Sequence, residues 1–104
     1  MCYEVLIAIW VKDPGDLIWF RFDFTQFIAN SLQPADTIAS HTVSLLSGSI
    51  TLVQHVATST AVSLQVSGGA SGSAALVQCT ATTSSGNVYY DEKTIYIQTR
   101  VEVP

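Results

Sequence analysis

The chain has 104 residues, of which 48% are hydrophobic and only 12% charged, and its formal net charge is −4. This length fits one domain with one core and excludes a two-domain protein. Nucleic-acid binding normally requires a clustered basic patch, and the four basic residues are scattered as Lys12, Arg21, Lys93 and Arg100, so we expect no nucleic-acid partner. An average soluble domain carries about 25% charged residues. A surface this poor in charge suits a protein that packs against neighbours in an assembly.

The first element is the apolar run of residues 2–11. It is shorter than the roughly 20 residues that a helix needs to cross a bilayer, so we expect no membrane partner. The run contains Glu4, has no basic residue before it and is followed by Lys12-Asp13-Pro14 instead of a small-residue cleavage site, which argues against a signal peptide. The run must still be covered by protein. It predicts either an edge strand of its own sheet or an arm that reaches a neighbouring subunit.

Residues 13–16 contain Pro14 and Gly15 and predict a turn. Residues 17–24 then alternate in the manner of a strand, with Ile18, Phe20, Phe22 and Phe24 on the expected core face. Residues 25–33 are the one place for a helical turn, in which Phe27, Ile28 and Leu32 are expected to plug one end of the core.

The second half of the chain continues with strand signals. Strands are expected over residues 37–46 and 50–55, separated by a turn at 47–49, and then over a run in which Val62, Leu64 and Val66 point inward. Residues 67–73 predict a loop that is too flexible to pack. Residues 74–83 and 88–101 complete the set, joined by a hairpin at Gly86-Asn87. The predicted core includes Phe20, Phe22, Val62, Leu64, Val66, Ile95 and Ile97.

About seven short strands with a turn signal roughly every ten residues predict an all-β fold, an immunoglobulin-like β-sandwich with a possible N-terminal arm. We divide the chain into residues 1–15, the apolar arm or edge strand, and residues 16–104, the sandwich domain. The antibody-type framework is missing, because Cys2 and Cys79 flank no tryptophan of a central strand. We expect both cysteines to be reduced thiols.

Five short motifs occur in order along the sequence, and they are Lys12-Asp13-Pro14, Asp23-Phe24, Asp36-Thr37-Ile38-Ala39-Ser40, Val66-Ser67-Gly68-Gly69-Ala70-Ser71-Gly72 and Thr82-Thr83-Ser84-Ser85-Gly86. In this order and spacing they resemble a family of small phage virion proteins, the fibre-tail adaptor or Ig-like tail proteins. The resemblance covers residues 12–100. The sequence departs from the family pattern in two places, since Val43 stands where a tryptophan is frequent, and Ala74 and Ala75 stand where an aromatic residue is frequent.

No motif predicts catalysis or a cofactor. His41 and His55 lie in no nucleophile-elbow context, and the histidines and cysteines are dispersed without metal-ligand spacing. The loop of residues 68–72 is followed by no lysine that could bind phosphate. We therefore expect no enzyme, no metal and no cofactor. A calcium site remains an alternative to simple turn capping for four aspartates near predicted strand ends, Asp13, Asp16, Asp23 and Asp36.

The resemblance implies a bacteriophage virion structural protein, made in the host cytoplasm and present in several copies per particle. As a tail or fibre adaptor it would bind tail, portal-proximal or fibre proteins. Burial of apolar surface and strand addition at a sheet edge would provide the contact. The alternatives are a capsid decoration protein of the same fold and a sugar-binding module for host adhesion. Trp10, Trp19, Tyr89 and Tyr90 could stack on sugars, and Asp91 and Glu92 could bind hydroxyl groups.

For the protein-binding interpretation, the candidate interface combines apolar residues of the N-terminal run with one of the two adjacent tyrosines, because one of that pair must point outward. These candidate residues are Tyr3, Val5, Ile7, Ile9, Trp10 and Tyr90.

Overall fold

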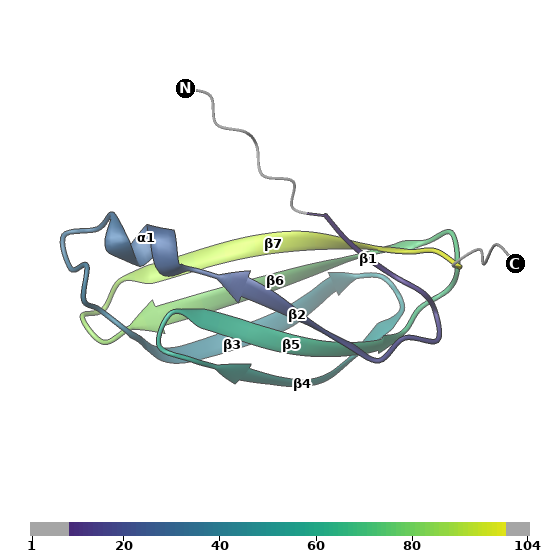
Figure 1. Ribbon diagram of the computed structural model, residues 1–104, viewed down its shortest axis with the longest axis horizontal. Coiled ribbons are helices and arrows are strands. Elements are labelled where there is room, and N and C mark those ends of the chain that lie inside the picture. The colour runs from purple at the N-terminus through teal and green to yellow at the C-terminus, as the bar shows by residue number, and fades with distance from the viewer. Residues whose placement is uncertain (1–8, 100–104) are drawn as a thin grey trace, which may run out of the picture.

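The computed structural model describes residues 9–99, which form a two-layered β-sandwich with one short helix (Figure 1). One layer is a four-stranded sheet in the order β1 (Ile9–Lys12), β7 (Val88–Ile97), β6 (Ala74–Thr83) and β3 (Ile38–Ser47). The other is a three-stranded sheet in the order β2 (Ile18–Asp23), β5 (Ala61–Gly68) and β4 (Ile50–Ala57). Helix α1 (Thr25–Ala29) lies at one end. The all-β sandwich is confirmed, whereas its immunoglobulin-like character stays a prediction.

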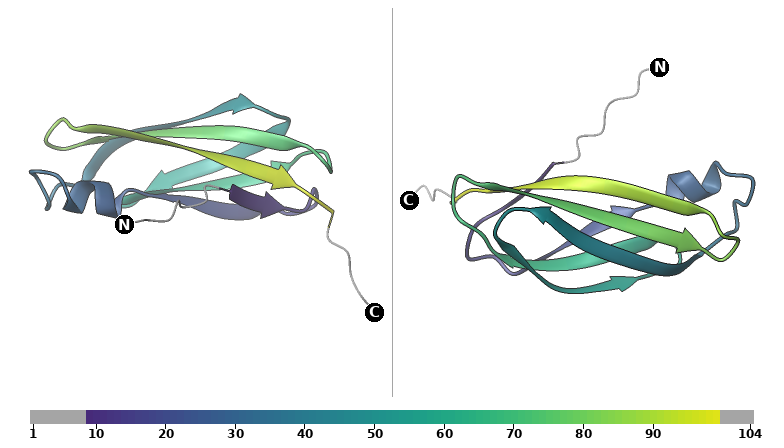
Figure 2. Two further views of the ribbon diagram at one scale, coloured as in Figure 1. Left: turned by 90° about the horizontal axis from the view of Figure 1, so that it is seen from above. Right: turned by 180° about the vertical axis from the view of Figure 1, so that it is seen from behind.

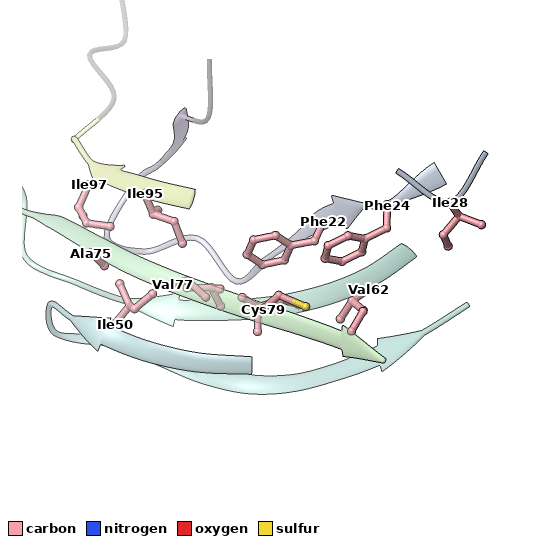
Figure 3. Close-up of a cluster of buried hydrophobic side chains, with 13 residues drawn as sticks. Phe22, Phe24, Ile28, Ile50, Val62, Ala75, Val77, Cys79, Ile95 and Ile97 are labelled. Carbon is pink, nitrogen blue, oxygen red and sulfur yellow. The ribbon is translucent and has the colours of Figure 1, made fainter. Parts of the chain in front are cut away.

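The strands alternate between buried and exposed side chains, and the buried sides of the two sheets face each other (Figures 2 and 3). On β6, every second residue from Ala75 to Thr83 is buried. The predicted core is confirmed for residues without exposed surface, which are Phe22, Val62, Leu64, Val66, Ile95 and Ile97.

Phe20 departs from that prediction, because it is only partly buried. It lies on β2, an edge strand of the three-stranded sheet, where no further strand covers its flank within residues 9–99. The ring of Trp10 takes that place. The two ring centroids are 4.5 Å apart and the planes differ by 5°, so the indole from the other sheet stacks on the phenyl ring.

One end of the core is closed by α1. Phe24 and Ile28 are buried there with 1% and 2% exposure, as predicted for Ile28. Leu32 was expected to join them, but this prediction is wrong, since Leu32 is 96% exposed. The helix ends at Ala29, and both the amide and the hydroxyl of Ser31 donate to the carbonyl of Ile28. These bonds end the helical path, so Leu32 no longer lies over the core.

The N-terminal run enters the fold through β1, which pairs in parallel with β7 from Ile9 opposite Thr94 to Lys12 opposite Ile97. These four residues form an edge strand of the four-stranded sheet. The rest of the predicted arm, residues 1–8, lies outside the described residues. The last strand was expected to reach residue 101 but ends at Ile97, after which the amide of Gln98 donates to the carbonyl of Lys12.

The glycine-rich loop after β5 is packed, and its prediction as a loop too flexible to pack is wrong. The amide of Gly72 donates to the carbonyl of Ile97 at 2.8 Å, and the amide of Ile97 donates to Ser73. A Cβ atom at Gly69 would lie 3.0 Å from the side chain of Ile97, and the φ of Gly69 is +104°. A glycine at this position lets the loop backbone press against the end of the core.

Lys12 is the least expected core residue, with 1% exposure. Its ammonium donates to the carbonyl of Asp13 at 2.8 Å and to the carbonyl of Gly68 at 2.6 Å. Lys12 belongs to the four-stranded sheet and Gly68 ends a strand of the three-stranded sheet. The bond therefore joins the two layers at one side of the sandwich, and the lysine stem fills space between them.

Phe22→Ala is expected to lower the free energy of unfolding by about 3–5 kcal/mol, because it leaves a cavity in the core. Denaturant unfolding measures this change. Trp19→Ala, three residues earlier and 45% exposed on the outer face, is the control and should cost far less. Equal losses for the two variants would contradict the core register described here.

Lys12→Met is expected to destabilise the fold by about 1–3 kcal/mol, since methionine keeps the apolar stem but leaves the carbonyl of Gly68 without its donor. Lys93→Met is the matched control. Its ammonium forms a partly exposed ion pair with Asp91 at 3.2 Å, and pairs of this kind contribute about 0–1 kcal/mol. An unchanged melting temperature of Lys12→Met would show that the contact between the layers is unimportant.

Candidate partner-binding surface

The outward side of the four-stranded sheet carries exposed tyrosines and aliphatic residues. Ile95 and Ile97 of β7 point into the core, so alternation turns Val88, Tyr90 and Tyr96 outward. These three side chains are 63%, 64% and 40% exposed. Val11, 53% exposed, lies beside Tyr96 on the neighbouring strand. We call this outward side of β1, β7, β6 and β3 the tyrosine face.

The tyrosine face is almost free of charge. β3 and β6 contain no acidic or basic residue other than His41, which points toward the other sheet. On β7, Asp91 and Lys93 lie on the inward side and pair with each other. Glu92 is therefore the one formal charge that β3, β6 and β7 turn outward, and it accepts a hydrogen bond from Gln78 at 3.1 Å.

The outer face of the three-stranded sheet has a different character. Its edge strand β2 exposes Trp19 together with the charged residues Arg21 and Asp23. Trp19 lies opposite Gln65, and Gln65 accepts a hydrogen bond from Gln54 of β4 at 2.7 Å. This face therefore offers one exposed ring among polar and charged side chains, and β4 adds the 53% exposed Val56, which lies opposite Ser63.

The predicted interface residues are distributed unevenly. Tyr90 lies on the tyrosine face, while Tyr3, Val5 and Ile7 lie outside the described residues. Ile9 starts β1 and pairs with Thr94.

Trp10, the remaining candidate, points inward and is half-buried. Its ring stacks on Phe20 and meets Phe22 edge-on at 5.1 Å. Its position gives no support to contact with a partner.

His41 and His55 form a pair that the sequence spacing did not reveal. His41 Nε2 lies 2.8 Å from His55 Nδ1, and the rings meet at 88°. Both residues lie on edge strands, β3 and β4. Burial, and then the neighbouring His55, hold the pKa of His41 below its ordinary value. Within residues 9–99, no group of three metal-binding side chains surrounds this pair or any other point.

The aspartates that are candidates for a calcium site accept hydrogen bonds in turns. Asp23 accepts hydrogen bonds from the amide and hydroxyl of Thr25, and the hydroxyl bond is the main reason that its pKa is lowered. Asp36 accepts from the hydroxyl of Ser85, which likewise lowers its pKa. Asp13 accepts from the amide of Gly15. These contacts are those of turn-capping residues.

The two packed sheets and the tyrosine face define the class of protein. It is a binding module of the β-sandwich type with an apolar and aromatic sheet face. No helix among residues 9–99 is long and apolar enough to cross a membrane. The chain belongs to the podophage GP4 fibre-tail adaptor protein gp77 family, whose family model matches residues 12–98. It is accordingly a structural component of the phage virion, a tail adaptor that binds other tail or fibre proteins. No curated protein gave a significant match.

The side-chain alternation of β7 could have revealed the tyrosine face from the sequence, because Val88, Tyr90 and Tyr96 share one parity. The signal for His41 and His55 was weaker. It consists of equal spacing about the turn, with each histidine seven residues from Gly48.

Cys79 is buried, and burial together with Asp91 raises the pKa of its thiol to about 12. Alkylation requires the thiolate, so we expect Cys79 to resist iodoacetamide at about pH 8 in the folded protein and to react after denaturation. A Cys2→Ser variant leaves Cys79 as the one cysteine, and mass spectrometry counts the modification. Rapid labelling of the folded variant would contradict this burial.

Proposed function

We propose that the tyrosine face is the surface by which this adaptor binds a neighbouring protein of the phage tail. The observation that carries the proposal is the combination of Tyr90, Tyr96, Val88 and Val11, each at least 40% exposed, on one side of one sheet. Isolated exposed apolar residues are ordinary, but a group of them on one flat face is typical of an interaction site.

The composition of the face matches what protein interfaces need. The cores of interfaces are depleted in charge and enriched in tyrosine, which contributes a large contact area and a hydroxyl that can bond across the boundary. The outward side chains of β6 are Ala74, Leu76, Gln78, Thr80 and Thr82, and none of them carries a charge. A partner would therefore dock on the sheet without leaving buried charges unpaired, apart from Glu92, which Gln78 already binds.

On the side of β3 and β4, docking on the face is better supported than addition of a strand at an edge. The edge strand β3 has register shifts between Ile38 and Ser40 and between Leu45 and Ser47. The other edge on that side, β4, has one between Leu52 and Gln54. Irregularities of this kind bend a strand and interrupt the regular row of backbone groups that a new strand would need.

The role requires neither catalysis nor a cofactor, and we propose that the protein has neither function. The support is that titratable side chains among residues 9–99 have other roles: Asp23 and Asp36 serve turns, Cys79 is a buried thiol, and Lys93 is paired with Asp91. The pair of His41 and His55 is joined by no third metal-binding side chain within these residues. The nature of the role also leads us to propose synthesis in the host cytoplasm, several copies per particle, and a portal-proximal or fibre protein as the partner.

A sugar-binding role is the second candidate, and one observation favours it. Trp19 is 45% exposed beside Gln65, whose amide is bonded to Gln54, so a ring and two amides lie in one row across the three-stranded sheet. Proteins commonly bind sugars by stacking an aromatic ring on the sugar ring while side-chain amides form hydrogen bonds with the sugar hydroxyl groups. Arg21 and Asp23 on the same face make it less suited to a protein partner.

The double variant Tyr90→Ser/Tyr96→Ser is expected to reduce incorporation into particles at least tenfold, because exposed tyrosines at the centre of an interface contribute about 2 kcal/mol or more each. Quantitative mass spectrometry of purified particles measures incorporation. Both residues are exposed, so the melting temperature of the isolated protein should change little.

Trp19→Ser is the matched control, since it removes an exposed ring from the opposite sheet. It should leave incorporation unchanged. If Trp19→Ser abolished incorporation and the double tyrosine variant did not, the outer face of the three-stranded sheet would be the binding surface and the present assignment would be wrong.

A further inference from the structure

The chain has an uninterrupted charge-free segment. Residues 37–90 contain no aspartate, glutamate, lysine or arginine, and this segment supplies β3, β4, β5 and β6 in full. His41 and His55 lie within it. They are the only side chains in the segment whose ordinary pKa lies near neutrality, so they alone can change its charge between about pH 5 and 8.

The fold brings these two histidines together at one side of the sandwich. β3 is an edge strand of the four-stranded sheet, and β4 is an edge strand of the three-stranded sheet. His41 lies opposite Ala81 and His55 lies opposite Leu64, and both of these partners are buried. The two imidazoles therefore occupy the inward register of their strands and meet across the gap between the layers, with 2.8 Å between Nε2 and Nδ1.

A hydrogen bond between two imidazoles needs one protonated and one unprotonated nitrogen. Two neutral rings satisfy this, and so does a pair that carries one positive charge. Protonation of both rings removes the acceptor and places two cations in contact. We propose that His41 and His55 form a pH-sensitive clasp that holds β3 to β4 at neutral pH and releases them in mild acid.

Within residues 9–99, the four strands nearest the pair provide no carboxylate that would stabilise a doubly charged pair. β3 and β4 contain no other titratable residue, β5 contains none, and β6 contributes only the neutral thiol of Cys79. The strand beyond β6 is β7, in which Asp91 lies opposite Cys79 and is paired with Lys93. The strand beyond β5 is β2, which carries Arg21 and Asp23. Asp36, ahead of β3, is bonded to Ser85.

The sign of the effect follows from the pKa of His41, which burial and His55 lower in the folded state. A histidine with a depressed folded-state pKa contributes stability that is fully present above its unfolded pKa, about 6.5. That contribution is lost as the pH falls below this value, because the unfolded chain then binds the proton more readily. Acid therefore weakens the β3–β4 side, where Val43 and Leu45 are only partly buried.

The clasp is independent of the proposed partner surface, because it lies between the layers and not on the tyrosine face. Its test uses the isolated protein. Melting temperatures are measured at about pH 7.5 and 5.5 for the natural chain and for His41→Gln/His55→Gln, whose amides can keep a hydrogen bond without titrating. The Gln54–Gln65 contact at 2.7 Å shows that a pair of this kind fits between neighbouring strands of this protein.

We expect the natural chain to lose roughly 4–8 °C more than the double variant between these pH values, the shift that about 1 kcal/mol produces in a domain of this size. The acidic residues are the same in both proteins, so the difference isolates the histidines. Equal losses would overturn the proposal.

Nuclear magnetic resonance of the two imidazoles in the natural chain gives a second readout that does not depend on the variant folding. We expect the titration of His41 to lie below its ordinary range, because burial and the neighbouring His55 oppose its protonation, and to move upward in His55→Gln. An ordinary titration of His41 near pH 6.5 in the natural chain, unchanged in His55→Gln, would overturn the clasp even if the double variant did not fold.

Discussion

The hydrogen bond from Lys12 to the carbonyl of Gly68 is the contact on which the arrangement of the layers depends. β1 has four residues and pairs with one end of β7, so its own ladder is short. The buried ammonium adds a connection to the last residue of β5 in the opposite sheet. Once Lys12 is fixed, the neighbouring Trp10 covers Phe20 and Phe22, and Val11 is turned outward beside Tyr96. One side of the core and one margin of the tyrosine face therefore share the same anchor.

Local alternation was enough to predict the strands but not how they are assigned to the two sheets. The pattern of Val62, Leu64 and Val66 has the same form in any sandwich, and all three are buried as expected. Gly48 illustrates what alternation leaves open. Its φ is +106°, and a Cβ there would lie 2.6 Å from the Cβ of Ala75, so the turn carries the chain from one sheet to the other in close contact with β6. Such a crossing depends on contacts that are distant in sequence.

The same dependence on structural context explains the predictions for Leu32 and for the loop of residues 67–73 that are wrong. Leu32 looked like a core residue because its spacing from Ile28 fits a helix, yet the bonds of Ser31 end that helix first. The loop of residues 67–73 looked flexible because it is rich in glycine and serine, yet Ile97 holds it through backbone bonds. For the candidate surface, the exposure of Tyr90 was predictable, whereas the position of Val11 beside Tyr96 depends on the parallel pairing of β1 with β7.

Two polar contacts join the layers of the sandwich, one made by Lys12 and the other by His41 and His55, and they differ in their response to acid. On one side, Lys12 donates to the carbonyl oxygens of Asp13 and Gly68, which are not titratable groups. On the other side, the closure depends on an imidazole that must stay unprotonated. Protons would thus loosen the β3–β4 side while the side bearing β1 stays fixed. Because Val11, Tyr90 and Tyr96 lie on β1 and β7, a partner bound there would contact the part of the sheet that the clasp does not control.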